Sequence, residues 1–178
     1  MRESQASGSI SPGVPLTVRP ELIDGSQWNQ CMSPPHSKHP LRVELVRVAL
    51  QWQEQCGIAP AITSALSEFD AAMLVGHTPE SYLGEMKGAT AVRKGFDFAY
   101  DGQRYQVKAN RPSGKPGSKV TKVGKPTNYD WDVLIWVLYN PLYEIQEVWA
   151  WPVAAYKNAI GNPPRLAPKD MQRGWSIL

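Results

Sequence analysis

Two polar residues in the segment FDFAYDGQRYQVKAN, residues 96–110, have the types and spacing to bind a cation, and a lysine is expected on the same face. The Asp-Gly pair at its centre predicts a two-residue hairpin turn, because both central positions of a type I′ turn need positive φ. The resulting register sets Asp97 opposite Gln106 and puts Lys108 one pleat further along the same face. Directly opposed Cβ atoms lie about 5 Å apart. Asp97 and Gln106 could therefore offer oxygens to one ion.

The same register divides the hairpin into an apolar and a polar face, because side chains alternate along a strand. The apolar face, which is expected to join the core, holds Phe96, Phe98, Tyr100, Tyr105 and Val107. The polar face holds Asp97, Ala99, Arg104, Gln106 and Lys108. Two interpretations of the polar face stay open. It is either an ion-binding site or a solvated sheet surface whose Asp–Lys pair contributes little to stability.

A basic segment overlaps the second strand of this hairpin and continues beyond it. Residues 102–129 contain no acidic side chain and seven basic ones: Arg104, Lys108, Arg111, Lys115, Lys119, Lys122 and Lys125. Because the whole chain carries a net charge of +3, the remaining residues carry about −4. A local basic block on a near-neutral protein indicates a polyanionic partner. The alternative is a solvated loop that the lysines keep soluble.

Two helices are expected to precede the hairpin. Residues 41–57 carry apolar side chains at helical spacing: Leu41, Leu45, Val48, Ala49, Trp52 and Cys56. Residues 60–76 carry a second stripe: Ile62, Ala65, Leu66, Phe69, Ala72 and Met73. Glu68 falls on the flank of this second stripe, beside alanines. Small neighbours would allow another element to approach Glu68 closely.

The rest of the chain predicts a sheet with irregular ends. WDVLIWVLY is nearly all apolar and is typical of a central strand buried on both faces. YEIQEVWAW predicts another strand, and PVAAYKNAIG a short helix after Pro152. A polar connection is expected over residues 77–94 and an irregular end after residue 160, with Trp175 anchored on the body. The Pro-, Ser- and Gly-rich residues 1–40 are expected to form an irregular or flexible arm.

The overall composition indicates one domain, residues 41–178, large enough to bury a core. Two cysteines, Cys31 and Cys56, give no disulfide framework and favour a reducing cytoplasm. Cys31, His36 and His39 match no structural zinc pattern. No run approaches the ~18 apolar residues of a membrane span, and the first residues lack the apolar core of a signal peptide. We therefore expect a cytoplasmic protein with no membrane contact.

Taken in order, these features resemble the PD-(D/E)XK nuclease superfamily. The resemblance runs through SALSEFDAAMLVG, GFDFAYDGQRYQVKANR, DWDVLIWVLYN and YEIQEVWAWP, which look like the small restriction-endonuclease-like domains of bacteria and their phages. It implies an α/β fold with a restriction-endonuclease-like mixed central β-sheet flanked by α-helices. It also implies a prokaryotic or phage-encoded endonuclease that hydrolyses phosphodiester bonds.

The resemblance assigns a role to each residue of the site. Asp97, Gln106, Lys108 and Glu68 match the catalytic positions, and Asp97, Gln106, Glu68 and the Val107 backbone carbonyl would hold Mg²⁺, with Mn²⁺ as the alternative. Two positions depart from the motif. Gly95-Phe96 stands where the motif name has proline. Gln106 replaces the second acid, so its oxygen can still bind a hard cation but brings no negative charge. Cation affinity should therefore be weaker.

The implied partner is nucleic acid, most readily double-stranded DNA. The residues expected to contact it are Asn110, Arg111, Lys115, Lys119, Lys122 and Lys125. Many restriction-like enzymes are dimers, so a homodimer stays open. Two rival functions also stay open. One is a non-catalytic nucleic-acid-binding module whose site has decayed at Gln106, and the other is a protein-interaction or inhibitor protein.

Overall fold

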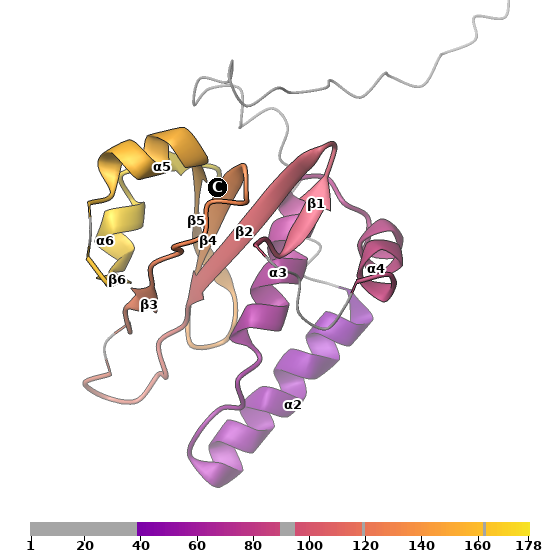
Figure 1. Ribbon diagram of the computed structural model, residues 1–178. Coiled ribbons are helices and arrows are strands. Elements are labelled where there is room, and N and C mark those ends of the chain that lie inside the picture. Colours follow the sequence, from indigo (N-terminus) through magenta and orange to yellow (C-terminus); the bar gives the residue numbers. More distant parts are fainter. Residues whose placement is uncertain (1–38, 90–94, 119, 162) are drawn as a thin grey trace, which may run out of the picture.

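A computed structural model describes residues 39–89, 95–118, 120–161 and 163–178 of the chain. A five-stranded sheet stands between helices on its two sides (Figure 1). The helices are α2 (Pro40–Cys56), α3 (Thr63–Leu74), α4 (Pro79–Lys87), α5 (Val153–Ala159) and α6 (Pro168–Met171). The strands are β1 (Phe98–Tyr100), β2 (Gln103–Asn110), β3 (Val123–Gly124), β4 (Val133–Tyr139), β5 (Ile145–Pro152), β6 (Arg165–Leu166) and β7 (Trp175–Ser176).

The sheet is mixed and mostly antiparallel. Its strand order is β1-β2-β4-β5-β7, with β2 and β4 parallel and the other neighbours antiparallel. Strands β3 and β6 form a separate two-stranded sheet. The predicted α/β class, a mixed sheet flanked by helices, is confirmed at this level. Residues 1–38 of the predicted irregular arm, with Cys31 and His36, lie outside the described residues, and Pro40, the last residue of the predicted arm, begins α2.

The hairpin follows the register that its Asp-Gly turn predicts. The pairs are Phe98 with Tyr105, Ala99 with Arg104 and Tyr100 with Gln103. Asp101 and Gly102 both have positive φ, 48° and 75°, as a type I′ turn needs.

One side chain of the hairpin lies on the opposite side from the prediction. Phe96 packs against the cluster around Trp131, Leu134 and Trp136, and not with Phe98. The reason is that the ladder ends at Phe98, so the alternation of a strand no longer fixes the direction of residues before it.

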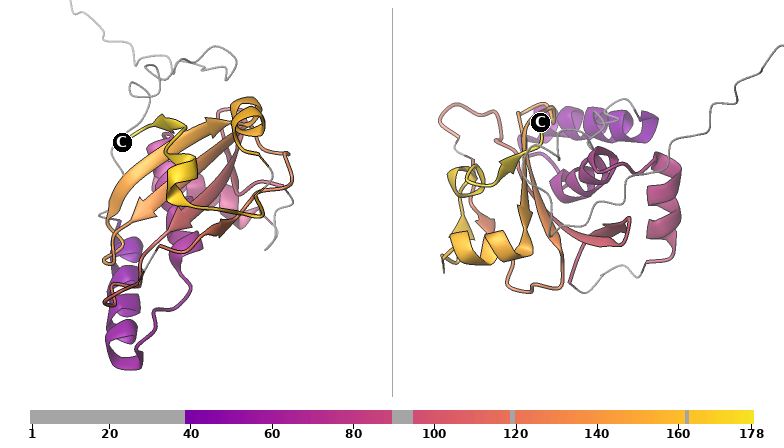
Figure 2. Two further views of the ribbon diagram at one scale, coloured as in Figure 1. Left: turned by 90° about the vertical axis from the view of Figure 1, so that its left-hand side faces the viewer. Right: turned by 90° about the horizontal axis from the view of Figure 1, so that it is seen from above.

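Strand β4 is the centre of the core. Val133, Leu134, Ile135, Trp136 and Val137 are all buried, which confirms a strand covered on both faces. One face packs against α3, and the other against α5 and α6. Figure 2 shows α2 and α3 on one side of the sheet and α5 and α6 on the other.

Helix α2 presents a different face to the body from the one that its apolar stripe predicts. Its buried residues are Arg42 and Ala49, and the remaining stripe is exposed: Leu41 69%, Leu45 40%, Val48 46% and Trp52 56%. Arg42 determines this orientation. Its guanidinium forms a bidentate ion pair with Asp70 of α3, at 2.6 and 2.7 Å, and Tyr139 of β4 donates to the same carboxylate. Apolar spacing alone does not reveal a buried ion pair.

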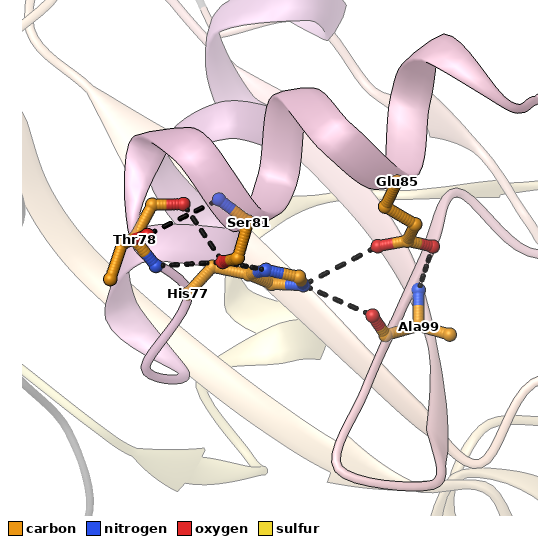
Figure 3. A network of polar contacts seen from close by, with 5 residues as sticks. All are labelled: His77, Thr78, Ser81, Glu85 and Ala99. Carbon is orange, nitrogen blue, oxygen red and sulfur yellow. Dashed lines mark hydrogen bonds and ion pairs between the residues drawn. The ribbon is translucent and has the colours of Figure 1, made fainter.

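The predicted polar connection over residues 77–94 is wrong where α4 forms. Thr78 caps this helix, since its hydroxyl accepts the Ser81 amide. Figure 3 shows the contacts that His77 and Glu85, at and beside α4, make with Ala99 of the edge strand β1. Glu85 accepts the Ala99 amide at 2.9 Å, and His77 Nε2 donates to the Ala99 carbonyl at 3.0 Å. An edge strand with unpaired backbone groups can pair with a strand of another chain. The contacts of His77 and Glu85 satisfy the backbone groups of Ala99 and so reduce this tendency.

The C-terminal end is more regular than its composition suggests. Residues expected to be irregular form β6, α6 and β7. Trp175, in β7, packs on the core and so anchors this end as expected. Within the described part of the chain, every helix is too short or too polar to cross a membrane.

Candidate functional site

A polar cavity of about 420 Å³ lies beside the part of β2 that β1 leaves uncovered. β1 pairs with β2 only as far as Tyr105, whereas β2 continues to Asn110. The walls come from α3, from the residue before β1, from β2 and from β3. The lining residues are Thr63, Ser64, Ser67, Glu68, Asp97, Gln106, Val107, Lys108, Ala109, Val123 and Gly124.

The cavity brings together all four residues that the sequence assigns to the reaction. Glu68 reaches it from the helix, Asp97 from the entry to the hairpin, and Gln106 and Lys108 from alternate positions of β2. The fold achieves this because α3 packs along β2 and its small residues, such as Ala71 and Ala72, allow a close approach. The catalytic and metal-binding roles of the four remain proposals.

The Asp97 carboxylate is held in place by β2. Its Oδ2 accepts the Val107 backbone N–H at 2.6 Å and also a hydrogen from the Gln106 amide nitrogen. The Asp97 backbone N–H donates to the Tyr105 carbonyl at 2.8 Å. Three contacts therefore fix Asp97, which is outside the regular ladder, in the lining of the cavity.

The electrostatics of the cavity favour a positive charge between the two carboxylates. The pKa of Glu68 is raised to about 7, mainly by burial and also by the nearby charge of Asp97, while the charge of Lys108 offsets part of the rise. Burial also raises the pKa of Asp97, against the hydrogen bond from Val107 and the charge of Lys108. Within the described residues, Glu68 and Lys108 form no direct ion pair. Titratable groups perturbed in this way are typical of functional sites.

The donor set suits a hard cation only in part. Two carboxylates, Glu68 and Asp97, and the Val107 carbonyl offer oxygens, which Mg²⁺ prefers. Across the described residues, no three His, Cys, Asp or Glu side chains gather into one group. Gln106 turns its amide nitrogen, not its oxygen, toward Asp97. The site as it stands therefore has two carboxylates and one carbonyl for a cation.

A row of hydroxyl groups on α3 was not anticipated from the sequence. Thr63, Ser64 and Ser67 line the cavity beside Glu68, and Ser67 donates to the Ser64 carbonyl at 2.9 Å. A signal for part of this row was present, because Ser64 precedes Glu68 by four positions and so shares its helix face. The wall formed by Val123 and Gly124 had no such signal, since β3 is only two residues long.

The first two residues assigned to the phosphate-binding set anchor the basic segment to the body. Asn110 is 2% exposed, and its amide donates to the Thr121 carbonyl. Arg111 donates to the carbonyl of Pro141 and lies 4.1 Å from the centre of the Tyr143 ring. Their side chains are therefore engaged within the protein, and phosphate contact by either one stays a prediction.

The lysines of the segment have different surroundings. Lys115 and Lys122 are exposed, and Lys122 directly precedes the β3 wall of the cavity. Lys125 donates to the Gly161 carbonyl at 2.6 Å. Lys119 lies outside the described residues. Lys122 is therefore the described lysine of this segment that is both exposed and next to a cavity wall.

No protein-family model matches the chain, and a search of curated proteins finds no significant similarity.

Proposed function

We propose that the protein is a metal-dependent nuclease that hydrolyses phosphodiester bonds, with DNA as its substrate. One observation carries the proposal. Glu68 and Asp97 meet Lys108 in a single cavity, both carboxyl groups have raised pKa values, and none of the described residues forms a direct ion pair with Glu68. The order of these residues along the chain, on a mixed sheet flanked by helices, resembles the restriction-endonuclease-like nucleases and supports the same function.

Glu68, Asp97 and the Val107 carbonyl would hold Mg²⁺ or Mn²⁺. Once bound, such a cation polarises a phosphate and makes a water molecule more acidic. The contribution of Asp97 is a fixed direction for its carboxylate, since the Val107 N–H holds it at 2.6 Å. Ligands that are already oriented reduce the reorganisation that binding and catalysis require.

The chain's own titratable groups fit a hydrolysis near neutral pH. Glu68, with a pKa of about 7 before a cation binds, is partly ionised near neutral pH, so a cation can replace its proton. Lys108 lies on the same cavity and can stabilise the negative charge that develops on a phosphate during attack.

The surroundings of the cavity fit a phosphodiester chain. The hydroxyl groups of Thr63 and Ser64 can donate to phosphate oxygens at the rim. The basic segment adds positive charge beside the β3 wall, which predicts a binding affinity that falls with salt. Double-stranded DNA is the substrate that we propose first, with RNA and single strands as alternatives for the assay.

A second candidate function is a nucleic-acid-binding module without catalysis. The observation that favours it is the Gln106 amide, whose N–H groups face the Asp97 carboxylate and the Val107 carbonyl. A site closed by its own amide group could bind phosphates through the lysines and never bind a cation. The two functions share the fold and the basic segment, so only an activity measurement separates them.

The test is cleavage of a plasmid in Mg²⁺ or Mn²⁺, with and without EDTA, by the wild type, Asp97→Asn and Lys108→Ala. We expect the wild type to cleave the plasmid and Asp97→Asn and Lys108→Ala not to cleave it. Asp101→Asn is the matched control, because it makes the same chemical change in the hairpin turn and asparagine tolerates positive φ there. Equal cleavage by Asp97→Asn and the wild type would refute the site. DNA binding without cleavage by the wild type would favour the binding module.

A third outcome would favour the rival from a different class, a protein-interaction or inhibitor protein. In that case the chain neither cuts nor binds nucleic acid at low salt. The basic segment would then be a solvated loop, and the exposed side chains of α2, such as Leu41 and Trp52, would be the surface to examine.

A further inference from the structure

The side-chain amide of Gln106 is turned so that it opposes cation binding. Its Nε2 donates to Asp97 Oδ2 and, at 3.4 Å, to the Val107 carbonyl. Both acceptors belong to the set that would hold a cation in the proposed function. The amide hydrogens therefore occupy oxygen lone pairs that a cation would need, and they supply part of the positive charge that it would bring.

Hydrogen bonding fixes this orientation of the amide. Turning the group over would set its carbonyl oxygen against two acceptor oxygens, which would repel it. Gln106 is only 8% exposed, so water has little room to relieve that repulsion. Oε1 makes no hydrogen bond to any described residue, although Gln106 lines the cavity. The amide is thus held at its nitrogen end and free at its oxygen end.

We propose that Gln106 is a lock on the cation site. A cation can bind to Asp97 and the Val107 carbonyl together only after the Gln106 amide turns by about 180° about its last side-chain bond, a torsion with two broad wells. The turn directs Oε1 to the place that Nε2 now holds. The lock rests on the proposed function, because it takes the cation site as its premise.

The lock predicts an effect with the opposite sign from that of an ordinary ligand. Breaking a hydrogen bond to a charged group lowers an equilibrium constant by about tenfold or more. Deleting the amide removes this cost and also removes one weak neutral ligand. If the lock dominates, a variant without the amide binds the cation more tightly than the wild type. If Gln106 is simply a ligand, the same variant binds more weakly.

The experiment is a calorimetric titration of Mn²⁺ into the full-length wild type, Gln106→Ala, Gln106→Met and Asp97→Asn. Gln106→Met keeps most of the side-chain volume, so it serves where Gln106→Ala loses stability. The matched control is Gln103→Ala, which removes another buried glutamine of β2 that does not line the cavity. Melting curves without Mn²⁺ show which variants are folded.

We expect both Gln106 variants to bind Mn²⁺ about tenfold more tightly than the wild type. Gln103→Ala should match the wild type, and Asp97→Asn should not bind. Weaker or unchanged binding by both Gln106 variants would overturn the lock and leave the cation site standing. If no protein in the series binds Mn²⁺, the cation site is overturned and the lock with it. Tighter binding by the variants without plasmid cleavage by any of them supports the lock and rejects the nuclease.

Discussion

The charge of Asp97 raises the pKa of Glu68, although the two residues come from different elements and are far apart in sequence. Two like charges near one another in a partly buried cavity cost free energy unless a cation or a proton joins them. Lys108 offsets only part of this repulsion. In the proposed function, protons and cations would compete for this cavity, and that competition is measurable.

The first prediction concerns stability as a function of pH. The pKa of Glu68 is raised from 4.5 to about 7 in the folded protein, so the folded state binds this proton more tightly than the unfolded state. The resulting stabilisation is fully present below about pH 4.5 and is lost as the pH rises to about 7. The free energy of unfolding of the wild type should therefore fall over this range relative to Glu68→Gln, whose amide stays neutral.

Chemical denaturation at pH 4.5, 5.5, 6.5 and 7.5 measures this difference. Glu54→Gln is the control, because Glu54 is exposed on α2 and its replacement should shift the wild-type curve by a constant. Parallel curves for Glu68→Gln and the wild type would show that Glu68 titrates as it does in water. Asp97, whose pKa is also raised by burial, is present in both proteins, so its own contribution cancels from the difference between the two curves.

The second prediction concerns Gln106→Glu. A third carboxylate beside Asp97 and Glu68 should lower the melting temperature in EDTA, because it adds like charge to a partly buried cavity. Mg²⁺ should restore stability, by about 2.7 kcal/mol at one hundred times its dissociation constant. Less Mg²⁺ should also be needed for cleavage. Melting curves over a Mg²⁺ series check this, and a melting temperature that ignores Mg²⁺ would contradict it.

The third prediction concerns the basic segment. Replacing Lys115, Lys119 and Lys122 together with alanine should weaken DNA binding and flatten the slope of log affinity against log salt by about 3 units. The matched control replaces three exposed lysines outside the segment, one each in α4, α5 and α6: Lys87, Lys157 and Lys169. Fluorescence anisotropy at several salt concentrations measures both slopes. Equal slopes for the two triple variants would identify the segment as a solvated loop.

The fourth prediction concerns the buried ion pair of α2 and α3. Arg42 is 8% exposed and Asp70 is fully buried, so Asp70→Asn leaves a charged guanidinium without its partner. Removal of one member of a buried pair costs about 3–5 kcal/mol. Asp132→Asn, which breaks an ion pair with the exposed Arg104, should cost less than about 1 kcal/mol. Urea unfolding compares the two, and similar costs would contradict the assignment of Arg42 as the residue that orients α2.

Local sequence signals were sufficient for the hairpin and for β4. The Asp-Gly turn determines three pairs of the register because it restricts the backbone at one point. The continuous apolar run of β4 indicates burial on both faces, whatever covers them. The two polar positions of β2, Gln106 and Lys108, follow from this register by alternation.

Structural features that depend on residues far apart in the sequence could not be predicted. The orientation of α2 follows from Arg42 and Asp70, which are separated by 28 positions, and helical spacing of apolar residues does not contain that information. The direction of the Gln106 amide depends on two acceptors that meet only in the folded protein. The β3 wall is equally non-local, because its partner strand is near the end of the chain.

That partner strand also determines when the cavity can close during synthesis. β3 pairs with β6, so Val123 and Gly124 gain their backbone partners only when Arg165 and Leu166 are present. A hairpin such as β1–β2 forms in microseconds, whereas a ribosome adds about 5–20 residues each second. In a nascent chain, the charged Asp97 is therefore exposed well before β3 can form its wall of the cavity. We expect nascent chains that end before β6 to lack a closed cavity, although their hairpin is already formed.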